Sequence, residues 1–185
     1  IISGTISLEE WPIITDNNIE STNFLFSESV SRMGKLEEVL EVNDVVTMGG
    51  FIGKTKDGII TTYERGGSDR TAADLGILFH EKYDTIIDLE KDSSVVSADP
   101  KIVKDDLEQV NELSYNEARL AGMFGMKIID PIAIKEILEN GLEIPLTITN
   151  MKSPEMITKI QRNPEDKGGH PLKIVTGKKN CAILR

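Results

Sequence analysis

The chain has 185 residues, a formal net charge of −10, an isoelectric point near 4.8 and a single cysteine. This acidic balance argues against a nucleic-acid-binding or anionic-membrane-binding surface, because phosphate-rich partners repel a negatively charged protein. No apolar run approaches the roughly 20 residues that cross a bilayer, and Cys181 has no partner for an intramolecular disulfide. We therefore expect a cytoplasmic protein without nucleic-acid or membrane partners. Because Ile1 is not preceded by a methionine, we also expect that an upstream part is missing.

Helices and strands are expected to alternate along the chain, in the order typical of an α/β domain. Apolar residues recur at helical spacing over 30–40, and a second helix is expected through Ala72 to His80. Short apolar runs beside turn residues predict strands at 44–50, 59–62, 85–89 and 144–149. The runs 44–50 and 85–89 are apolar enough to be buried, and the carboxyl end of a central parallel strand at 85–89 would face ligands.

Two further helices carry capping signals. Ser114 and Glu117 have the spacing of a capping box, which predicts a helix that begins at this point. Asp130 followed by Pro131 indicates an N-cap with proline in the first helical position, and Gly141 is expected to close that helix.

The composition changes after residue 150. Residues 151–170 contain two prolines, two adjacent glycines and many charges, so they are expected to form a linker. Beyond it, 172–175 and 180–184 are expected to be strands. The predicted organisation is a domain over 1–150, the linker, and the start of a second domain over 171–185.

The most informative stretch is 51–71, in which an apolar strand and a turn lead to a glycine-rich helix start. The glycines at 66–67 let the backbone approach a ligand closely, and Ser68 or Asp69 is expected to cap the helix. Free N–H groups at a helix start attract anions, and the planar fork of Arg65 can hold a carboxylate with two hydrogen bonds. Because Asp69 also offers an acceptor for an ammonium group, the combination suits an amino acid.

This stretch resembles the signature of the aspartate kinases, in which Phe-Ile-Gly, a turn and Thr-Thr lead into Gly-Arg-Gly-Gly-Ser-Asp-x-Thr-Ala-Ala. Further similar segments extend the resemblance over most of the chain, at 13–18, 99–103, 114–118, 124–127 and 144–149. The terminal strand resembles the opening of the ACT regulatory region that follows the catalytic domain in this family.

The resemblance implies a three-layer αβα sandwich of the amino-acid kinase, or carbamate kinase-like, type, with a mainly parallel central sheet and without its N-terminal part. The chain would be the C-terminal portion of the catalytic domain over 1–150, then the linker and the truncated start of an ACT domain. The implied reaction is phosphoryl transfer from ATP, with Mg2+, to the side-chain carboxylate of L-aspartate. It gives 4-phospho-L-aspartate for lysine, threonine and methionine synthesis. The complete protein would be a homodimer.

The resemblance also assigns two groups of site residues. The substrate-binding group is Phe51, Gly53, Arg65, Gly66, Gly67, Ser68 and Asp69. The nucleotide-binding group is Glu90, Lys91, Asp92, Val96, Lys101, Lys127 and Ile128. Asp69 and Lys127 are the expected catalytic residues, because phosphoryl transfer depends on orientation of the substrate and on cations near the phosphate. No residue is expected to hold a resident metal ion.

Departures from the family pattern leave alternatives open. Tyr63 and Glu64 replace Leu-Gly before Arg65, which places a negative charge beside the expected carboxylate clamp. The segment 90–96 lacks the glycine and the aromatic residue of the family's nucleotide element, and Lys101 replaces an arginine. The alternatives are a non-catalytic amino-acid-binding paralogue and a related amino-acid kinase that acts on another acid. Because the family's first phosphate-binding strand has no counterpart here, the chain alone is expected to be weakly active or inactive.

Overall fold

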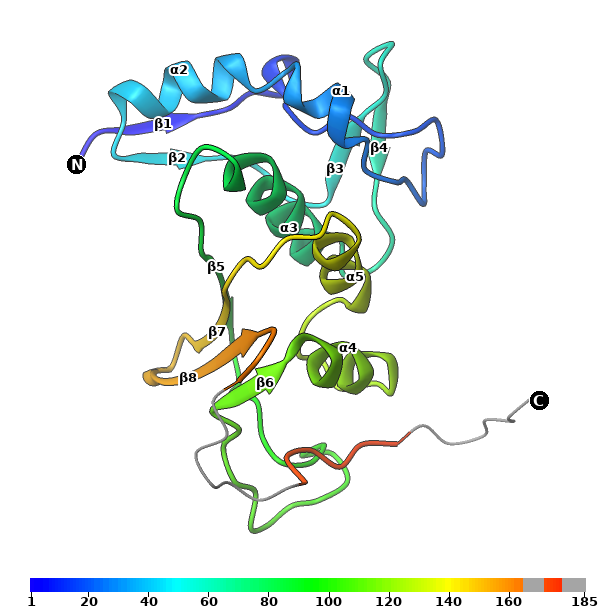
Figure 1. Cartoon of the computed structure of the whole chain (residues 1–185), viewed down its shortest axis with the longest axis vertical. Coiled ribbons are helices and arrows are strands. Elements are labelled where there is room, and N and C mark those ends of the chain that lie inside the picture. The colour runs from blue at the N-terminus through cyan, green and yellow to red at the C-terminus, as the bar shows by residue number, and fades with distance from the viewer. Residues whose placement is uncertain (165–171, 178–185) are drawn as a thin grey trace. The chain divides into compact units, whose positions relative to one another are not determined.

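The computed structural model describes residues 1–164 and 172–177. The chain divides into two compact units, Ile1–Asp84 and Thr85–Arg185, which we call the N-terminal unit and the C-terminal unit (Figure 1). The elements of the N-terminal unit are β1 (Ser3–Thr5), the 3-10 helix η1 (Leu8–Glu10), α1 (Phe26–Val30), α2 (Gly34–Val42), β2 (Val45–Thr47), β3 (Ile52–Lys54), β4 (Ile60–Thr62) and α3 (Gly67–His80).

The N-terminal unit contains two small sheets around an apolar core. Strands β1 and β2 pair in parallel, and β3 and β4 form an antiparallel hairpin. The buried core is made of Ile6, Trp11, Ile13, Met33, Leu36, Tyr63 and Leu78. The indole N–H of Trp11 donates a hydrogen bond of 2.9 Å to the carbonyl of Ile52. The core thus anchors β3 and the residues on either side of it.

Two expectations for this unit need correction. The segment 30–40 is not one helix, because the chain turns between α1 and α2, although Met33 and Leu36 are buried as the spacing predicts. The strand predicted at 44–50 is shorter and less buried than expected, since β2 has three residues and Val45 is 47% exposed. The strand at 59–62 and the helix through His80 are confirmed by β4 and α3.

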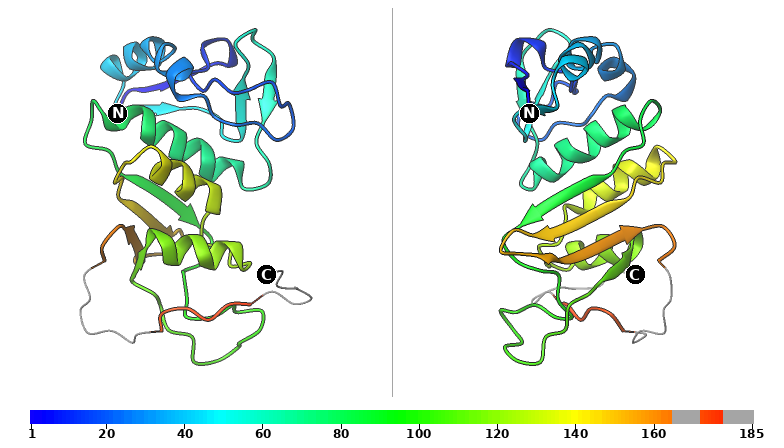
Figure 2. Two further views of the ribbon diagram at one scale, coloured as in Figure 1. Left: turned by 45° about the vertical axis from the view of Figure 1, so that its right-hand side comes forward. Right: turned by 90° about the vertical axis from the view of Figure 1, so that its left-hand side faces the viewer.

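The C-terminal unit is a four-stranded sheet with helices on one face. Its elements are β5 (Ile87–Lys91), β6 (Glu112–Ser114), α4 (Tyr115–Met123), α5 (Pro131–Glu139), β7 (Leu146–Asn150) and β8 (Ser153–Gln161). The strand order is β5-β7-β8-β6, in which β7 and β8 are antiparallel and the two outer pairs are parallel. Both α4 and α5 lie on the same side of this sheet (Figure 2).

The alternation of side chains along β7 explains which face is covered. Leu146 and Ile148 are buried, and Thr147 and Thr149 point to the opposite face. There the two threonine hydroxyls donate hydrogen bonds of 2.6 and 2.9 Å to Oδ1 of Asp88 on the neighbouring strand β5. A period of two therefore separates an apolar face from a polar one.

The predicted helix caps of the C-terminal unit are confirmed. Ser114 accepts a hydrogen bond from the Glu117 N–H, and the Glu117 carboxylate accepts one from the Ser114 N–H, which together form a capping box. Asp130 caps α5 through the Ile132 N–H, Pro131 is the first helical residue, and Gly141 follows the helix end with a φ of 70°. These signals succeed because each depends on residues within one helical turn.

The linker expected over 151–170 is wrong for its first half. Residues 153–161 form β8, which hydrogen-bonds to β7 along most of its length and to β6 at its end. Residues 165–171 and 178–185, including His170, Cys181 and the second predicted terminal strand, lie outside the described residues. Of the first predicted terminal strand, Val175 forms a single parallel bridge with Ala98.

The observed fold is α/β, as expected, and parallel strand pairs outnumber antiparallel ones by three to two among the described residues. Within that part of the chain, no helix combines the length and the apolar character that a membrane-spanning helix needs.

The capping box makes stability depend on pH. Burial opposes ionisation of Glu117, but hydrogen bonds from Ser114 and the ion pair with Lys173, at 3.1 Å, outweigh burial and lower the pKa of this carboxyl below its usual 4.5. A carboxyl whose pKa is lower in the folded state than in the unfolded state stabilises the fold at pH values above its unfolded-state pKa. This stabilisation is lost as the pH falls through its folded-state pKa.

We expect Glu117→Gln, which keeps an acceptor oxygen but not the charge, to flatten the decline of the urea midpoint between about pH 6 and pH 3. The control is Glu139→Gln, which removes an exposed ion pair with Lys135. Parallel curves for wild type and Glu117→Gln would contradict this assignment.

Candidate functional sites

The residues 64–69, which we call the glycine loop, comprise the end of the connection from β4 and the first three residues of α3 in the N-terminal unit. Gly66 has a φ of 97°, in the left-handed region where glycine is favoured, and is the N-cap of α3. No side chain caps this helix, so the expected capping by Ser68 or Asp69 is wrong. The N–H groups of Gly67 and Asp69 donate to the carbonyls of Glu64 and Gly66, both at 3.0 Å. Two of the N–H groups expected to be free for an anion are therefore used within the loop.

Phe51 is hydrogen-bonded to Thr71 near the start of α3. Its φ of 74° is unusual for a non-glycine residue. The Phe51 N–H donates to Oγ1 of Thr71 at 2.9 Å, and the Phe51 carbonyl accepts from the Tyr63 N–H at 3.0 Å. The strained conformation is thus held by two hydrogen bonds, as is common at functional sites.

Gly67 has no room for a side chain. A Cβ at this position would lie 2.4 Å from Cβ of Tyr63 and 2.7 Å from Cδ2 of Phe51. Ser68 is the neighbour of Gly50, where a Cβ would lie 3.2 Å from the Ser68 hydroxyl oxygen. The structure therefore brings Phe51, Gly66, Gly67 and Ser68 close together, and their role in substrate binding stays a prediction.

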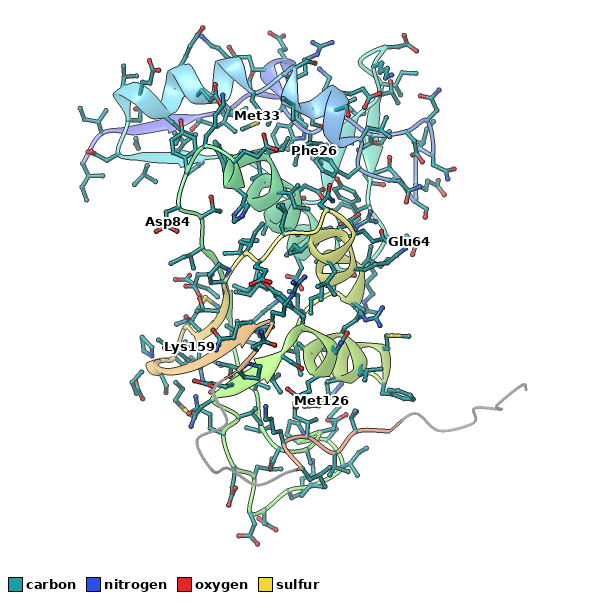
Figure 3. All side chains as sticks on the ribbon, viewed as in Figure 1. Phe26, Met33, Glu64, Asp84, Met126 and Lys159 are labelled. Atoms are coloured by element: carbon teal, nitrogen blue, oxygen red, sulfur yellow. The ribbon has the colours of Figure 1, made fainter. Side chains whose placement is uncertain are left out.

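Arg65 and Glu64 are exposed residues of the glycine loop, and Figure 3 labels Glu64 between β4 and α3. The Glu64 carboxylate accepts a hydrogen bond of 2.6 Å from the Ser21 hydroxyl. The Ser21 hydroxyl thus binds this carboxylate from outside the loop but leaves its negative charge beside Arg65.

Gly53 lies in β3, and a Cβ there would come within 2.3 Å of Cγ2 of Thr15. Packing against Thr15 is thus sufficient to explain this glycine. Its place in a substrate wall stays a prediction, as does the substrate-orienting role of Asp69.

A second candidate site is a cavity of about 150 Å3 in the C-terminal unit, which we call the lysine pocket. It is lined by Lys91, Ser93, Ser94, Val95, Val96, Asp99, Pro100, Lys101, Gly125, Met126, Lys127, Ile128 and Ile148. Lys91 is the last residue of β5 and pairs with Asn150 at the end of the parallel strand β7. The pocket is therefore at the carboxyl ends of parallel strands, where ligands bind in open α/β sheets.

Local hydrogen bonds shape the walls of the lysine pocket. The Asn150 side chain donates to the Ser94 hydroxyl at 2.8 Å, which ties the loop after β5 to the end of β7. Asp99 accepts from the Lys101 N–H at 2.9 Å and so acts as the turn residue that its place before Pro100 indicates. Among the other lining residues, Gly125 has a φ of 100° and follows the C-cap of α4, two residues before Lys127, and Figure 3 labels the adjacent Met126.

The charge of the lysine pocket is opposite to that of the whole chain. Three lysines and one aspartate line it, whereas the chain carries a net charge of −10. An anion is the ligand that this concentration of positive charge favours. The cavity is smaller than the roughly 300–1,000 Å3 of pockets that enclose a whole drug-sized ligand, so it can enclose only part of a ligand of that size.

The sequence predictions for this pocket are placed as follows. Lys91, Val96, Lys101, Lys127 and Ile128 line it, and Glu90 and Asp92 are neighbours in sequence that do not. Gly125, Met126 and Ile148 were not predicted. The segment 124–127 already carried a family-like motif, and Ile148 is recognisable only once β7 is known to pair with β5. Among the described residues, no group of three or more histidine, cysteine, aspartate or glutamate side chains is arranged to hold a metal ion.

Comparison with known proteins gives a consistent result. The model of the amino acid kinase family matches residues 14–150. The chain is 30% identical over 158 residues to the aspartokinase of Rickettsia felis, an alignment that covers 84% of this chain and 37% of that protein. It is also 30% identical over 146 residues to aspartokinase 1 of Bacillus subtilis, covering 77% of this chain and 35% of that protein. The chain thus spans a little over a third of the length of these relatives.

A solved structure shares the fold. Escherichia coli aspartokinase III, in complex with aspartate and ADP, matches with a TM-score of 0.73 and 22% identity over 89% of this chain and 36% of that chain. The family match covers well over half of the sequence and includes the glycine loop and the lysine pocket. The chain therefore belongs to the amino acid kinase family.

Proposed function

We propose that the intact protein carrying this chain is an aspartate kinase that transfers the γ-phosphoryl group of ATP to the side-chain carboxylate of L-aspartate. The observation that carries this proposal is the construction of the glycine loop, in which Gly67 has no room for a Cβ beside Phe51 and the adjacent Arg65 is exposed. Its support is that the same loop lies in the family match and that the curated relatives are aspartokinases.

In this proposal the glycine loop binds the amino acid. Arg65 would hold the α-carboxylate through its planar fork, because two parallel charge-assisted hydrogen bonds fix both position and orientation. Asp69 would orient the substrate, and Gly66, Gly67 and Ser68 would line its site. Phe51 and Gly53 would form the wall beside it.

The lysine pocket would bind the nucleotide. Lys127 would contact phosphate; Lys91 and Lys101 also line the cavity, and Val96 and Ile128 form part of its apolar lining. Mg2+ bound to nucleotide phosphates usually takes one or two protein carboxylates. Asp99 is the lining residue that can provide one, so the residues present fit a magnesium ion that arrives with the nucleotide.

In this proposal the residues would position the two substrates and neutralise their negative charge. A phosphoryl group moves between two anionic oxygens through a loose transition state, and both oxygens are held in line by groups that bind rather than react. Arg65 would supply fixed positive charge to the amino acid and Lys127 to the nucleotide, so no protein nucleophile is required. The same proposal includes three points that rest on the resemblance. They are a role in lysine, threonine and methionine synthesis, a cytoplasmic location and a homodimer formed through an ACT region.

The direct test is trapping of the acyl phosphate with hydroxylamine in the presence of ATP, Mg2+ and L-aspartate. Hydroxamate formation that requires both ATP and aspartate is the expected result. Turnover with glutamate or acetylglutamate in place of aspartate would favour a related amino-acid kinase. Saturable aspartate binding without turnover would favour the non-catalytic paralogue.

The role of Lys127 can be tested separately. We expect Lys127→Gln to raise the KM for ATP by about 10-fold or more, because a charge-assisted contact to phosphate contributes roughly 1.5–3 kcal/mol, and to leave the KM for aspartate unchanged. The matched control is Lys135→Gln on α5, which removes an exposed ion pair with Glu139. Equal KM values for ATP in the two variants would show that Lys127 does not bind the nucleotide.

A further inference from the structure

Three polar side chains are buried beside the glycine loop. Tyr63 follows β4, and Arg70 and Asp74 lie one helical turn apart on α3. Tyr63 and Asp74 have no exposed surface, and Arg70 is 3% exposed. We call these three residues the tyrosine cluster.

Tyr63 contacts the other two members through different parts of its side chain. Its hydroxyl donates a hydrogen bond to Oδ2 of Asp74. The guanidinium carbon of Arg70 lies 4.4 Å from the centroid of its ring, which is within the distance of a cation–π interaction. The cluster therefore connects the end of β4 to the first two turns of α3.

The tyrosine cluster is continuous with the walls of the glycine loop. A Cβ added to Gly67 would lie 2.4 Å from Cβ of Tyr63, so Tyr63 helps to exclude a side chain at this position. The Tyr63 N–H holds the carbonyl of Phe51 at 3.0 Å. A displacement of Tyr63 would consequently move both Gly67 and Phe51.

Stability alone does not account for such a cluster. Burial of an arginine and an aspartate carries a desolvation cost, and well-packed apolar residues of similar volume are often as stabilising or more so. What hydrogen bonds and ring contacts add is a defined geometry, because each partner has fixed directions in which it can interact.

We propose that Tyr63, Arg70 and Asp74 are positioning residues for the amino-acid substrate. They fix the start of α3 against Phe51, so that Arg65 and Asp69 project from the glycine loop in one arrangement that fits the two charged groups of the amino acid. This inference rests on the proposed function and adds three residues that do not touch the substrate themselves.

The test is Tyr63→Phe in the intact protein, which removes the hydroxyl and keeps the ring. The matched control is Tyr115→Phe in the C-terminal unit, since Tyr115 is also buried and its hydroxyl donates a 2.5 Å hydrogen bond to the Ile144 carbonyl. Tyr115→Phe loses a hydroxyl contact to a neutral carbonyl, which contributes about 1 kcal/mol, whereas Tyr63→Phe loses one to the buried Asp74 carboxyl, which contributes roughly 1.5–3 kcal/mol. We expect a KM for aspartate about 3- to 10-fold higher in Tyr63→Phe alone, with the KM for ATP unchanged in both variants.

Hydrogen exchange provides a second readout that does not need activity. Amides 64–69 are expected to exchange faster in Tyr63→Phe than in wild type or Tyr115→Phe. An unchanged aspartate KM together with unchanged exchange in 64–69 would overturn the inference. If wild type shows no aspartate-dependent turnover, the proposed function is contradicted, and the exchange of 64–69 alone decides whether the tyrosine cluster positions the loop.

Discussion

Replacing Arg65 by alanine is expected to raise the KM for aspartate by about 10- to 100-fold, with a smaller change in the KM for ATP. The physical reason is the loss of a bidentate, charge-assisted contact, in which hydrogen bonds to charged groups contribute roughly 1.5–3 kcal/mol. Arg65 is exposed in the glycine loop, so the substitution removes the fork without creating a cavity. Steady-state kinetics with aspartate and ATP varied in turn, together with calorimetric titration of aspartate, measures the effect.

Two companion variants make the Arg65 result specific. Arg65→Lys keeps the charge and loses the planar fork, so its aspartate KM should lie between those of wild type and Arg65→Ala. Arg162→Ala removes an equally charged side chain that forms a 2.6 Å surface ion pair with Glu143 and should leave aspartate kinetics unchanged. An aspartate affinity of Arg65→Ala equal to that of wild type would sink the assignment of Arg65 to the carboxylate.

Gly67→Ala is expected to be the most damaging single-methyl change in the glycine loop. The added Cβ would lie 2.4 Å from Cβ of Tyr63 and 2.7 Å from Cδ2 of Phe51, so either α3 or Phe51 has to move. Overpacking of this kind destabilises by about 1–3 kcal/mol, and we expect aspartate turnover to be lost as well. Chemical denaturation and the hydroxamate assay measure the two effects independently.

Gly34→Ala is the matched control for this substitution. Gly34 is the first residue of α2, and a Cβ there meets nothing within 4 Å. Alanine is a better helix former than glycine by up to about 1 kcal/mol, so this variant should be as stable as wild type or more so. If Gly67→Ala kept both wild-type stability and wild-type turnover, the close approach of Tyr63 and Phe51 to the loop would not be a functional constraint.

The sequence predicted those elements whose signals are local. The caps of α4 and α5 were recognisable because their hydrogen bonds connect residues two or three positions apart. Strand β8 was not recognisable, because only Thr158 and Ile160 of its nine residues are buried and Pro154 lies near its start. The structure explains the proline: β6 pairs with β8 only at 159–161, and no other described strand pairs with the segment around Pro154 on that side, where a proline is tolerated.

The candidate sites show the same distinction. The glycine loop was predicted from one contiguous motif, and Lys127 from a second. The tyrosine cluster was beyond prediction, because residues 63, 70 and 74 become a unit only when α3 packs against the end of β4. The N-cap of α3 was misassigned for a related reason, since the left-handed conformation of Gly66 replaces the side-chain cap that Ser68 or Asp69 would provide.

The position of β8 decides where this protein can be shortened for expression. A polypeptide that stops at residue 150, where the composition changes, keeps β7 and β6 and loses the strand to which both are bonded. The backbone N–H and C=O groups that pair with β8 at Leu146, Ile148 and Leu113 would then lie on open sheet edges, which favour association between chains. A truncation that preserves the C-terminal unit therefore has to retain every residue through Gln161.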